Sequence, residues 1–182
     1  MTATLEAPSP VTDRWSCYQE IVSWVDMCML MTRTLDGRFA SRPMSTLEYA
    51  GHETIWLATD STSRKATEIR VDPLVNLAFY NDQTREWLSV CGRAELVHDA
   101  EKIARLHTPL WTLWLPTLDA NRDGSATDPR ITLVAVHIER VHYFKRAAGA
   151  VRSWTQITGN FTDETPSRNT GTGADRAFGT MS

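Results

Sequence analysis

The sequence has few of the residues that define metal-binding and disulfide-stabilised proteins. It contains three cysteines, Cys17, Cys28 and Cys91, whose odd number and spacing fit no zinc-binding pattern. Its five histidines are scattered and form no HExxH motif. We therefore expect no metal site, and we expect the cysteines to be buried thiols in a reducing compartment.

Long apolar runs and an excess of basic residues are also absent. The longest apolar run, residues 27–31, is far too short to span a bilayer. Residues 1–10 lack the basic and apolar regions of a secretory signal. A net charge of -3 lacks the basic bias of a nucleic-acid-binding protein. We therefore expect a cytoplasmic protein that binds neither membranes nor nucleic acid.

The common catalytic and nucleotide-binding motifs are missing as well. The sequence contains no GxSxG, GxxxxGK or GxGxxG segment, and no spacing marks a catalytic triad. No residue can therefore be assigned as catalytic from the sequence.

What the chain does contain is enough apolar material for one domain. Of its 182 residues, 42% are hydrophobic, which is sufficient for a substantial core. Seven tryptophans are a high count, and they suggest an interface or a ring-binding pocket in addition to core packing.

The local patterns predict short strands with few helices. Asp36-Gly37 is a strong hairpin signal between the first two strands, and Pro109 should kink or split the last helix. Strands are expected at 27–34, 38–48, 54–59, 75–80, 87–96 and 131–145, and helices at 15–25, 64–71 and 99–115. This order predicts a mainly β (α+β) small antiparallel barrel and excludes a doubly wound parallel sheet.

The composition divides the chain into three parts. Residues 1–13 are expected to form a flexible arm, 14–150 a barrel domain, and the Thr- and Gly-rich residues 151–182 a largely mobile tail.

The segment 59–65, TDSTSRK, is the most informative stretch of the chain. A strand ends, a hydroxyl-rich loop follows, and Arg64 and Lys65 begin a helix. The amide groups and dipole of a helix N-terminus favour an anion, and Ser63, Arg64 and Lys65 add donors, so a phosphate would fit. The alternative is a solvated helix start whose cations face water.

A second polar segment is Ser41-Arg42-Pro43-Met44-Ser45-Thr46. Pro43 lacks an amide donor, which predicts that this strand lies at an edge or a bulge. Backbone exposed there could bind a flat heterocycle, and a plain polar edge strand is the alternative. Gly92 similarly predicts a bulge or close packing in the strand 87–96.

Together these segments resemble the pyridoxamine-phosphate-oxidase-like superfamily. The resemblance rests on Asp36-Gly37, Arg42, the loop 59–65, Asp72-Pro73 with the strand 75–79, and the strand 90–97, in that order. The stretch Trp111-x-x-Trp114-Leu-Pro116 is most similar to the general stress protein 26 group. The resemblance covers roughly residues 17–145 and implies a six-stranded split β-barrel homodimer that binds FMN at the subunit interface.

The resemblance also implies roles for individual residues. Arg42, Arg64 and Lys65 match positions that bind the FMN phosphate, and Thr59 and Ser63 match positions that contact phosphate or ribityl oxygens. The strand residues Pro43, Met44 and Ser45 would lie along the isoalloxazine ring, chiefly through backbone groups.

Tryptophans complete the implied site. Trp87 stands where the oxidases tend to place a glutamine that reaches the flavin. Trp114, with Trp111, could supply a wall of the partner's pocket, and packing within the core is the alternative for both.

Two departures from the oxidases argue against vitamin B6 as the substrate. The chain ends without the Arg-x-His-x-Arg run of those enzymes, and Leu47 stands where they carry a lysine. The sequence therefore predicts an FMN-binding flavoprotein, and an oxidoreductase of unidentified substrate is the first hypothesis. A non-catalytic FMN store or sensor, and a related barrel that uses the deazaflavin F420, are the alternatives.

Overall fold

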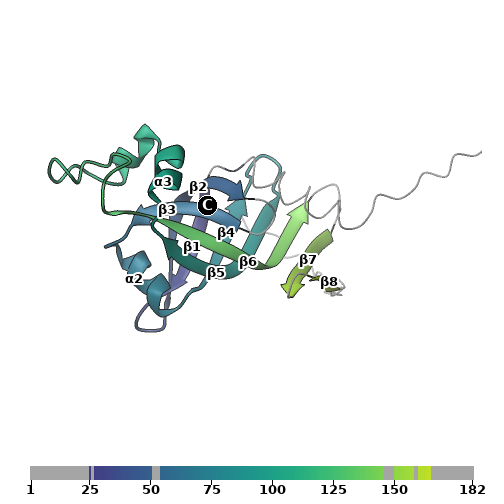
Figure 1. Cartoon of the computed structure of the whole chain (residues 1–182). Coiled ribbons are helices and arrows are strands. Elements are labelled where there is room, and N and C mark those ends of the chain that lie inside the picture. The colour runs from purple at the N-terminus through teal and green to yellow at the C-terminus, as the bar shows by residue number, and fades with distance from the viewer. Residues whose placement is uncertain (1–24, 26, 51–53, 146–149, 158–159, 165–182) are drawn as a thin grey trace, which may run out of the picture.

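A computed structural model describes residues 25, 27–50, 54–145, 150–157 and 160–164. Within these residues the chain forms one antiparallel sheet with two α-helices and a short 3₁₀ helix (Figure 1). The strands are β1 (Met27–Arg33), β2 (Phe39–Ala50), β3 (Thr54–Asp60), β4 (Leu74–Tyr80), β5 (Trp87–Val97), β6 (Ile131–Lys145), β7 (Ala150–Ile157) and β8 (Asn160–Glu164). The helices are α2 (Arg64–Val71), α3 (Ala100–Leu106) and the 3₁₀ helix η1 (Pro109–Leu113).

Six of the strands close into a barrel. The sheet order is β3-β2-β1-β4-β5-β6, and β3 also pairs with β6. All of these pairings are antiparallel, from the β1–β2 hairpin that turns at Asp36-Gly37 to the β3–β6 contact that closes the barrel. The predicted fold class, a mainly β six-stranded antiparallel barrel with flanking helices, is confirmed.

The alternation of buried and exposed side chains follows from the barrel. In β1 and β4 every second residue is buried, as a strand with one face toward a core requires. The inward side chains form one apolar cluster, which includes Leu30, Leu57, Leu77, Phe79 and Val90.

A second apolar cluster lies outside the barrel, under α3 and η1. Trp111 is 7% exposed there and packs with Ile103, Leu115, Ile131 and Leu133. Core packing is therefore the correct reading for Trp111. The long helix expected over 99–115 is divided as Pro109 predicts: α3 ends at Leu106, and Pro109 begins η1.

Two further strands, which the sequence did not predict, follow the barrel. β7 pairs with the end of β6, and β8 pairs with β7, so that a hairpin extends the sheet beyond the barrel (Figure 1). The mobility expected for residues 151–182 stays a prediction. The helix expected over 15–25 lies outside the described residues, except for Val25.

The close approach of β5 and β6 explains Gly92. The register of this pair shifts between Cys91 and Gly92, and a Cβ atom built on Gly92 would stand 2.2 Å from the His137 carbonyl oxygen. The predicted close packing is confirmed, whereas the extra residue of the bulge is Glu139 on β6, opposite Cys91 and Gly92, and not a residue of the strand 87–96. Within the part of the chain that the structure describes, no helix is long and apolar enough to span a membrane.

Candidate functional site

The helix α2 begins where the sequence predicts, and its start is the centre of the candidate site. Ser63 is the N-cap residue, and its hydroxyl accepts a hydrogen bond from the Ala66 amide at 3.4 Å. The Asp60 side chain orders the preceding turn by accepting the Thr62 amide at 2.7 Å. Pro73 follows the C-cap residue Asp72 and ends the helix. The sequence therefore fixes both ends of α2 locally.

α2 packs against β1 and β5 at one end of the barrel (Figure 1). Ala66, Glu68 and Ile69 are its buried residues, and Ile69 belongs to the barrel core. This packing holds the start of α2, with Arg64 and Lys65, beside the inward face of β2 and the end of β3.

Arg42 points from β2 toward this same end of the barrel. Its side chain is 21% exposed, and its Nη2 atom donates to Glu68 Oε2 at 2.9 Å. Its Nη1 atom donates to the hydroxyl of Thr32 on β1. From the other side, Arg64 Nε donates to Glu68 Oε1 at 2.9 Å. Both arginines that the sequence analysis placed at the phosphate are therefore joined through one carboxylate.

Lys65 and two hydroxyls complete the group. Burial, and then the neighbouring charge of Arg42, lower the pKa of Lys65 below its usual range. Thr59, buried at the end of β3, lies with its Oγ1 atom 3.3 Å from Ser63 Oγ. We call Arg42, Thr59, Ser63, Arg64 and Lys65 the cation cluster.

The chemistry of the cation cluster suits a phosphate. Three cationic side chains and two hydroxyls surround the N-terminus of a helix, where amide groups and the helix dipole also favour an anion. Among the described residues, neither the Lys65 ammonium group nor the Nη atoms of Arg64 have a hydrogen-bonding side-chain partner. These free donors, and the part that the Arg42 charge plays in lowering the pKa of Lys65, indicate positive charge that an anion would neutralise.

Two members of this arrangement were missed by the sequence analysis: Thr32 and Glu68. Glu68 is fully buried, and burial alone would raise the pKa of its carboxyl group. The hydrogen bond from Thr32, together with the charge and hydrogen bond of Arg42, holds the pKa of Glu68 below its usual range instead. The helical spacing of Arg64 and Glu68, four residues apart, was the one signal in the sequence.

The strand proposed to lie along a flat ring has an open edge. Residues 39–45 of β2 pair with β1, whereas the pairing of β2 with β3 begins only at Thr46. Pro43 lies in this singly paired half, so the predicted edge position is confirmed there, and a register shift follows between Thr46 and Glu48. Met44 is 8% exposed and faces the core, whereas Ser45 is exposed, so only backbone groups of Met44 can face a ligand.

The two remaining predicted residues, Trp87 and Trp114, are not brought to the cation cluster by any contact within the described residues. Trp87 begins β5 and pairs with Tyr80 and Phe144. Trp114 follows η1 and is 65% exposed. A shallow cavity of about 430 Å³ lies near Trp87, and it is lined by Val25, Met27, Tyr80 and the turn 81–84. Met27 pairs with Ser45, so the cavity borders the open half of β2.

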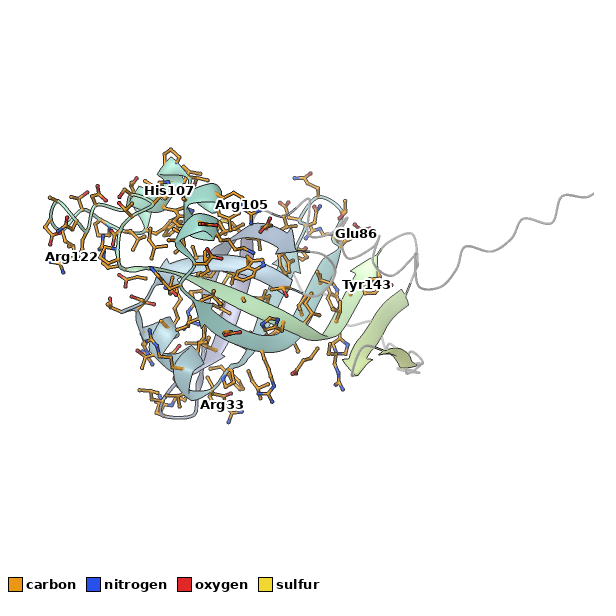
Figure 2. All side chains as sticks on the ribbon, viewed as in Figure 1. Arg33, Glu86, Arg105, His107, Arg122 and Tyr143 are labelled. Carbon is orange, nitrogen blue, oxygen red and sulfur yellow. The ribbon has the colours of Figure 1, made fainter. Side chains whose placement is uncertain are left out.

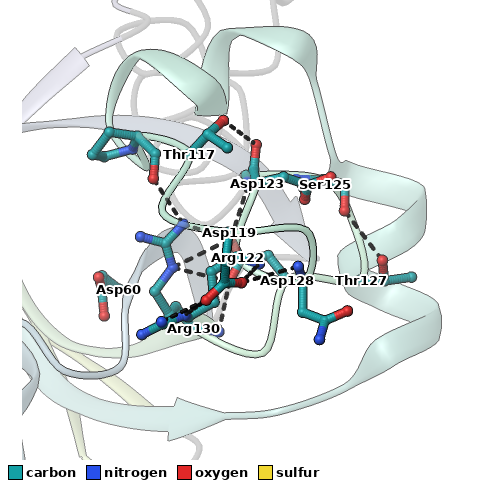
Figure 3. Close-up of polar contacts among 12 residues, drawn as sticks. Asp60, Thr117, Asp119, Arg122, Asp123, Ser125, Thr127, Asp128 and Arg130 are labelled. Atoms are coloured by element: carbon teal, nitrogen blue, oxygen red, sulfur yellow. Dashed lines mark hydrogen bonds and ion pairs between the residues drawn. The ribbon is translucent and has the colours of Figure 1, made fainter.

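A second polar cluster contacts the loop that precedes α2. Asp128 and Arg130 form a buried ion pair, with Arg130 Nη2 2.6 Å from Asp128 Oδ2 (Figure 3). The Arg130 carbonyl oxygen accepts the Ser61 amide at 2.7 Å. The loop 116–130 is thereby tied to the loop that carries Thr62 and Ser63. Figure 2 shows the exposed Arg122 of this loop far from Tyr143 on β6.

Nothing in the described residues suggests a metal centre: they contain no group of three or more His, Cys, Asp or Glu side chains placed to hold an ion. The site is therefore defined by cations, hydroxyls and open backbone.

Comparison with models of known protein families identifies the family of this barrel. Residues 13–166 match the model of the family described as pyridoxamine 5'-phosphate oxidase like. The chain belongs to this family. The resemblance inferred from the ordered motifs is thus confirmed.

One protein compared by sequence and two of known structure illustrate the likeness, the latter two in fold. Protein bli-3 of Neurospora crassa is 26% identical over 144 residues, which are 78% of this chain and 69% of that protein. A pyridoxamine 5'-phosphate oxidase-related, FMN-binding protein of Nostoc punctiforme superposes with a TM-score of 0.67 at 16% identity, covering 87% of this chain and 97% of that chain. A protein of Clostridium acetobutylicum related to general stress protein 26 gives a TM-score of 0.64 at 20% identity, covering 79% and 94%.

Proposed function

We propose that this chain binds FMN, with the flavin phosphate held by the cation cluster, and that it acts as an FMN-dependent oxidoreductase whose substrate is not vitamin B6. The observation that carries the proposal is the convergence of Arg42, Arg64 and Lys65 at the N-terminus of α2. A phosphomonoester is close to doubly negative at neutral pH and accepts hydrogen bonds through three oxygens, so it matches this donor set.

The rest of the cofactor would lie beside the cation cluster. The open half of β2, residues 39–45, offers unpaired backbone groups to the polar edge of a flat ring. When bound, FMN supplies the redox chemistry, and the protein binds and orients it. The cavity lined by Met27, Tyr80 and the turn 81–84 lies beside β1, whose Met27 pairs with Ser45 of β2, and a second reactant could approach there; Trp87 pairs with Tyr80 on the side away from β2.

F420 is the alternative cofactor, because it also carries a phosphate. An F420 reductase shares the fold, with a TM-score of 0.53 at 17% identity, covering 68% of this chain and 94% of that chain. FMN is favoured because its phosphate is a terminal monoester, which uses all three cations. Titration of the purified protein with each cofactor separates the two.

Replacing Arg64 by alanine is expected to weaken FMN binding by about 1.5–3 kcal/mol, the range for hydrogen bonds to charged groups. Arg64 is suited to this test because its side chain is 74% exposed and its loss leaves the barrel core intact. FMN affinity is measured by quenching of flavin fluorescence. Arg105→Ala is the matched control, since Arg105 pairs with Glu48 outside the cluster and should leave the affinity unchanged. Retention of wild-type affinity by the Arg64 variant would contradict the phosphate assignment.

We further propose that the chain is a homodimer whose interface completes the flavin site. α3 and η1 cover the outer side of β3 and β6, where Trp56, Ala58 and Leu133 pack with them. In the described residues no helix covers the outer face of β1, β4 and the start of β5. That face presents Met27, Met29 and Tyr80, which are 44%, 42% and 51% exposed. Neighbouring exposed apolar side chains of this kind favour a protein partner, and the open half of β2 borders the same face.

Replacing Met29 by glutamate is therefore expected to produce a monomer at concentrations where the wild type is a dimer. A buried charge in an apolar interface is costly, whereas Met29 is exposed enough in the single chain for the variant to fold. Leu35→Glu is the control, because Leu35 is 68% exposed at the tip of the β1–β2 hairpin. Light scattering after size exclusion measures both. A dimeric Met29→Glu protein, or a monomeric wild type, would place the interface elsewhere or exclude it.

A further inference from the structure

The carboxylate of Glu68 lies between the two arginines of the cation cluster and is fully buried. It accepts hydrogen bonds from three different elements. Thr32 Oγ1 on β1 donates to Oε2 at 2.6 Å, Arg42 Nη2 on β2 donates to Oε2 at 2.9 Å, and Arg64 Nε on α2 donates to Oε1 at 2.9 Å. Each carboxylate oxygen therefore takes one guanidinium group.

This arrangement addresses a physical problem of the site. Arg42, Arg64 and Lys65 are like charges brought together from β2 and α2, and without an anion they repel one another. Glu68 offsets that repulsion and fixes the orientation of each guanidinium plane. Arg64 uses only its Nε atom toward Glu68, so its two Nη atoms remain available for a ligand.

From this geometry, and resting on the proposed function, we infer a role for Glu68. We propose that Glu68 is a positioning residue that holds Arg42 and Arg64 ready for a phosphomonoester, and that it thereby gives the site its preference for FMN over unphosphorylated riboflavin.

A competing effect of Glu68 has the opposite sign. Its negative charge lies close to a bound phosphate, so removing that charge would by itself strengthen anion binding. The hydrogen-bond geometry outweighs this effect. A glutamine at position 68 has one acceptor oxygen for two guanidinium groups, and its amide group would point donors at another donor. One arginine must then leave its place, and binding FMN would require the site to be rebuilt.

The test compares FMN and riboflavin binding to the full-length chain by fluorescence titration. Glu68→Gln keeps the shape of the side chain and removes its charge, and Glu68→Asp keeps the charge and shortens the reach. Both variants are expected to bind FMN about tenfold more weakly while riboflavin affinity changes little. A merely structural role would lower both affinities equally. If Glu68→Gln keeps the wild-type preference for FMN over riboflavin, the inference is overturned. If only Glu68→Asp keeps that preference, the charge of the residue and not the position of its carboxylate sets the preference, and the positioning role is overturned.

A milder variant covers the case in which the Glu68 proteins do not fold. Thr32→Val removes the hydroxyl that contacts both Glu68 and Arg42 but preserves the side-chain shape. It is expected to lower the preference for FMN about threefold, and an unchanged preference would overturn the inference.

Failure of this inference is distinguishable from failure of the proposed function. A wild-type protein that binds FMN and riboflavin equally, or neither, would defeat the phosphate site itself. A wild-type preference for FMN that is lost in Arg64→Ala but kept in the Glu68 and Thr32 variants would defeat only the role of Glu68.

Discussion

Replacing Asp128 by asparagine is expected to lower the free energy of unfolding by about 3–5 kcal/mol, the usual cost of leaving one partner of a buried ion pair uncompensated. The side chain of Asp128 is fully buried and that of Arg130 is 8% exposed. Asp128 also accepts the amides of Gly124 at 2.8 Å and Arg130 at 2.9 Å, while Arg130 donates to the Pro116 carbonyl oxygen (Figure 3). The Asp128 carboxylate thus joins Gly124, in the middle of the loop 116–130, to Arg130 at its end, and Arg130 in turn contacts Pro116 at its start.

The matched control is the exposed pair of the same loop. Asp119 and Arg122 are 44% and 49% exposed, so Asp119→Asn should cost about 1 kcal/mol or less. Urea unfolding of both variants against the wild type measures the difference. Equal effects of the two substitutions would contradict the account of this loop. Because the Arg130 carbonyl oxygen holds the Ser61 amide, we also expect Asp128→Asn to weaken FMN binding.

The effect of Asp128 should depend on pH in a defined direction. The hydrogen bond from the Arg130 side chain lowers the pKa of Asp128 to about 2 in the folded protein, whereas an aspartate in the unfolded chain has a pKa of about 3.9. A depressed folded-state pKa gives stability that is complete above the unfolded value and lost as the pH falls through the folded value. The stability difference between wild type and Asp128→Asn should therefore be constant above about pH 5 and shrink toward pH 2. A difference that does not change over this range would exclude the ionised pair.

Gly92→Ala is the second substitution with a large expected effect. The added Cβ atom would stand 2.2 Å from the His137 carbonyl oxygen and 3.2 Å from Val136 Cγ1. Backbone, not a flexible side chain, is the obstacle, so β5 and β6 must separate at the bulge where their register shifts. We expect a loss of about 3 kcal/mol, at the upper end for overpacked sites, or a fall in Tm of about 6–12 °C.

Gly37→Ala separates this steric effect from backbone strain. Gly37 has a φ of +81°, but a Cβ atom there would meet nothing within 4 Å. The cost should be about 1–2 kcal/mol, the penalty for placing an L-residue in the left-handed region. In thermal unfolding, the Tm of Gly92→Ala should therefore be well below the Tm of Gly37→Ala. The reverse order would mean that β5 and β6 are farther apart than described.

Local chemistry explains why much of the fold could be predicted. α2 was predicted with its observed bounds, because Ser63 caps it and Pro73 ends it. The hairpin at Asp36-Gly37 and the division of the third helix at Pro109 likewise depend on residues with few backbone choices. Such signals act within a few residues and can be read from a single sequence.

Long-range contacts explain what could not be predicted from patterns. The β3–β6 pairing that closes the barrel joins segments more than seventy positions apart, from Thr54↔His137 to Asp60↔Ile131. Helical spacing alone could not separate the buried Trp111 from the exposed Trp114. The role of Glu68 required knowing that β1 and β2 place Thr32 and Arg42 against the same helix. The strands β7 and β8 were not predicted, because the composition of residues 151–182 indicated a mobile tail.

The central claim is that this barrel carries FMN, and an absorption spectrum of the purified protein tests it most directly. We expect a yellow protein with the two visible bands of an oxidised flavin, from which heat releases FMN. A colourless protein that also fails to take up added FMN would contradict it.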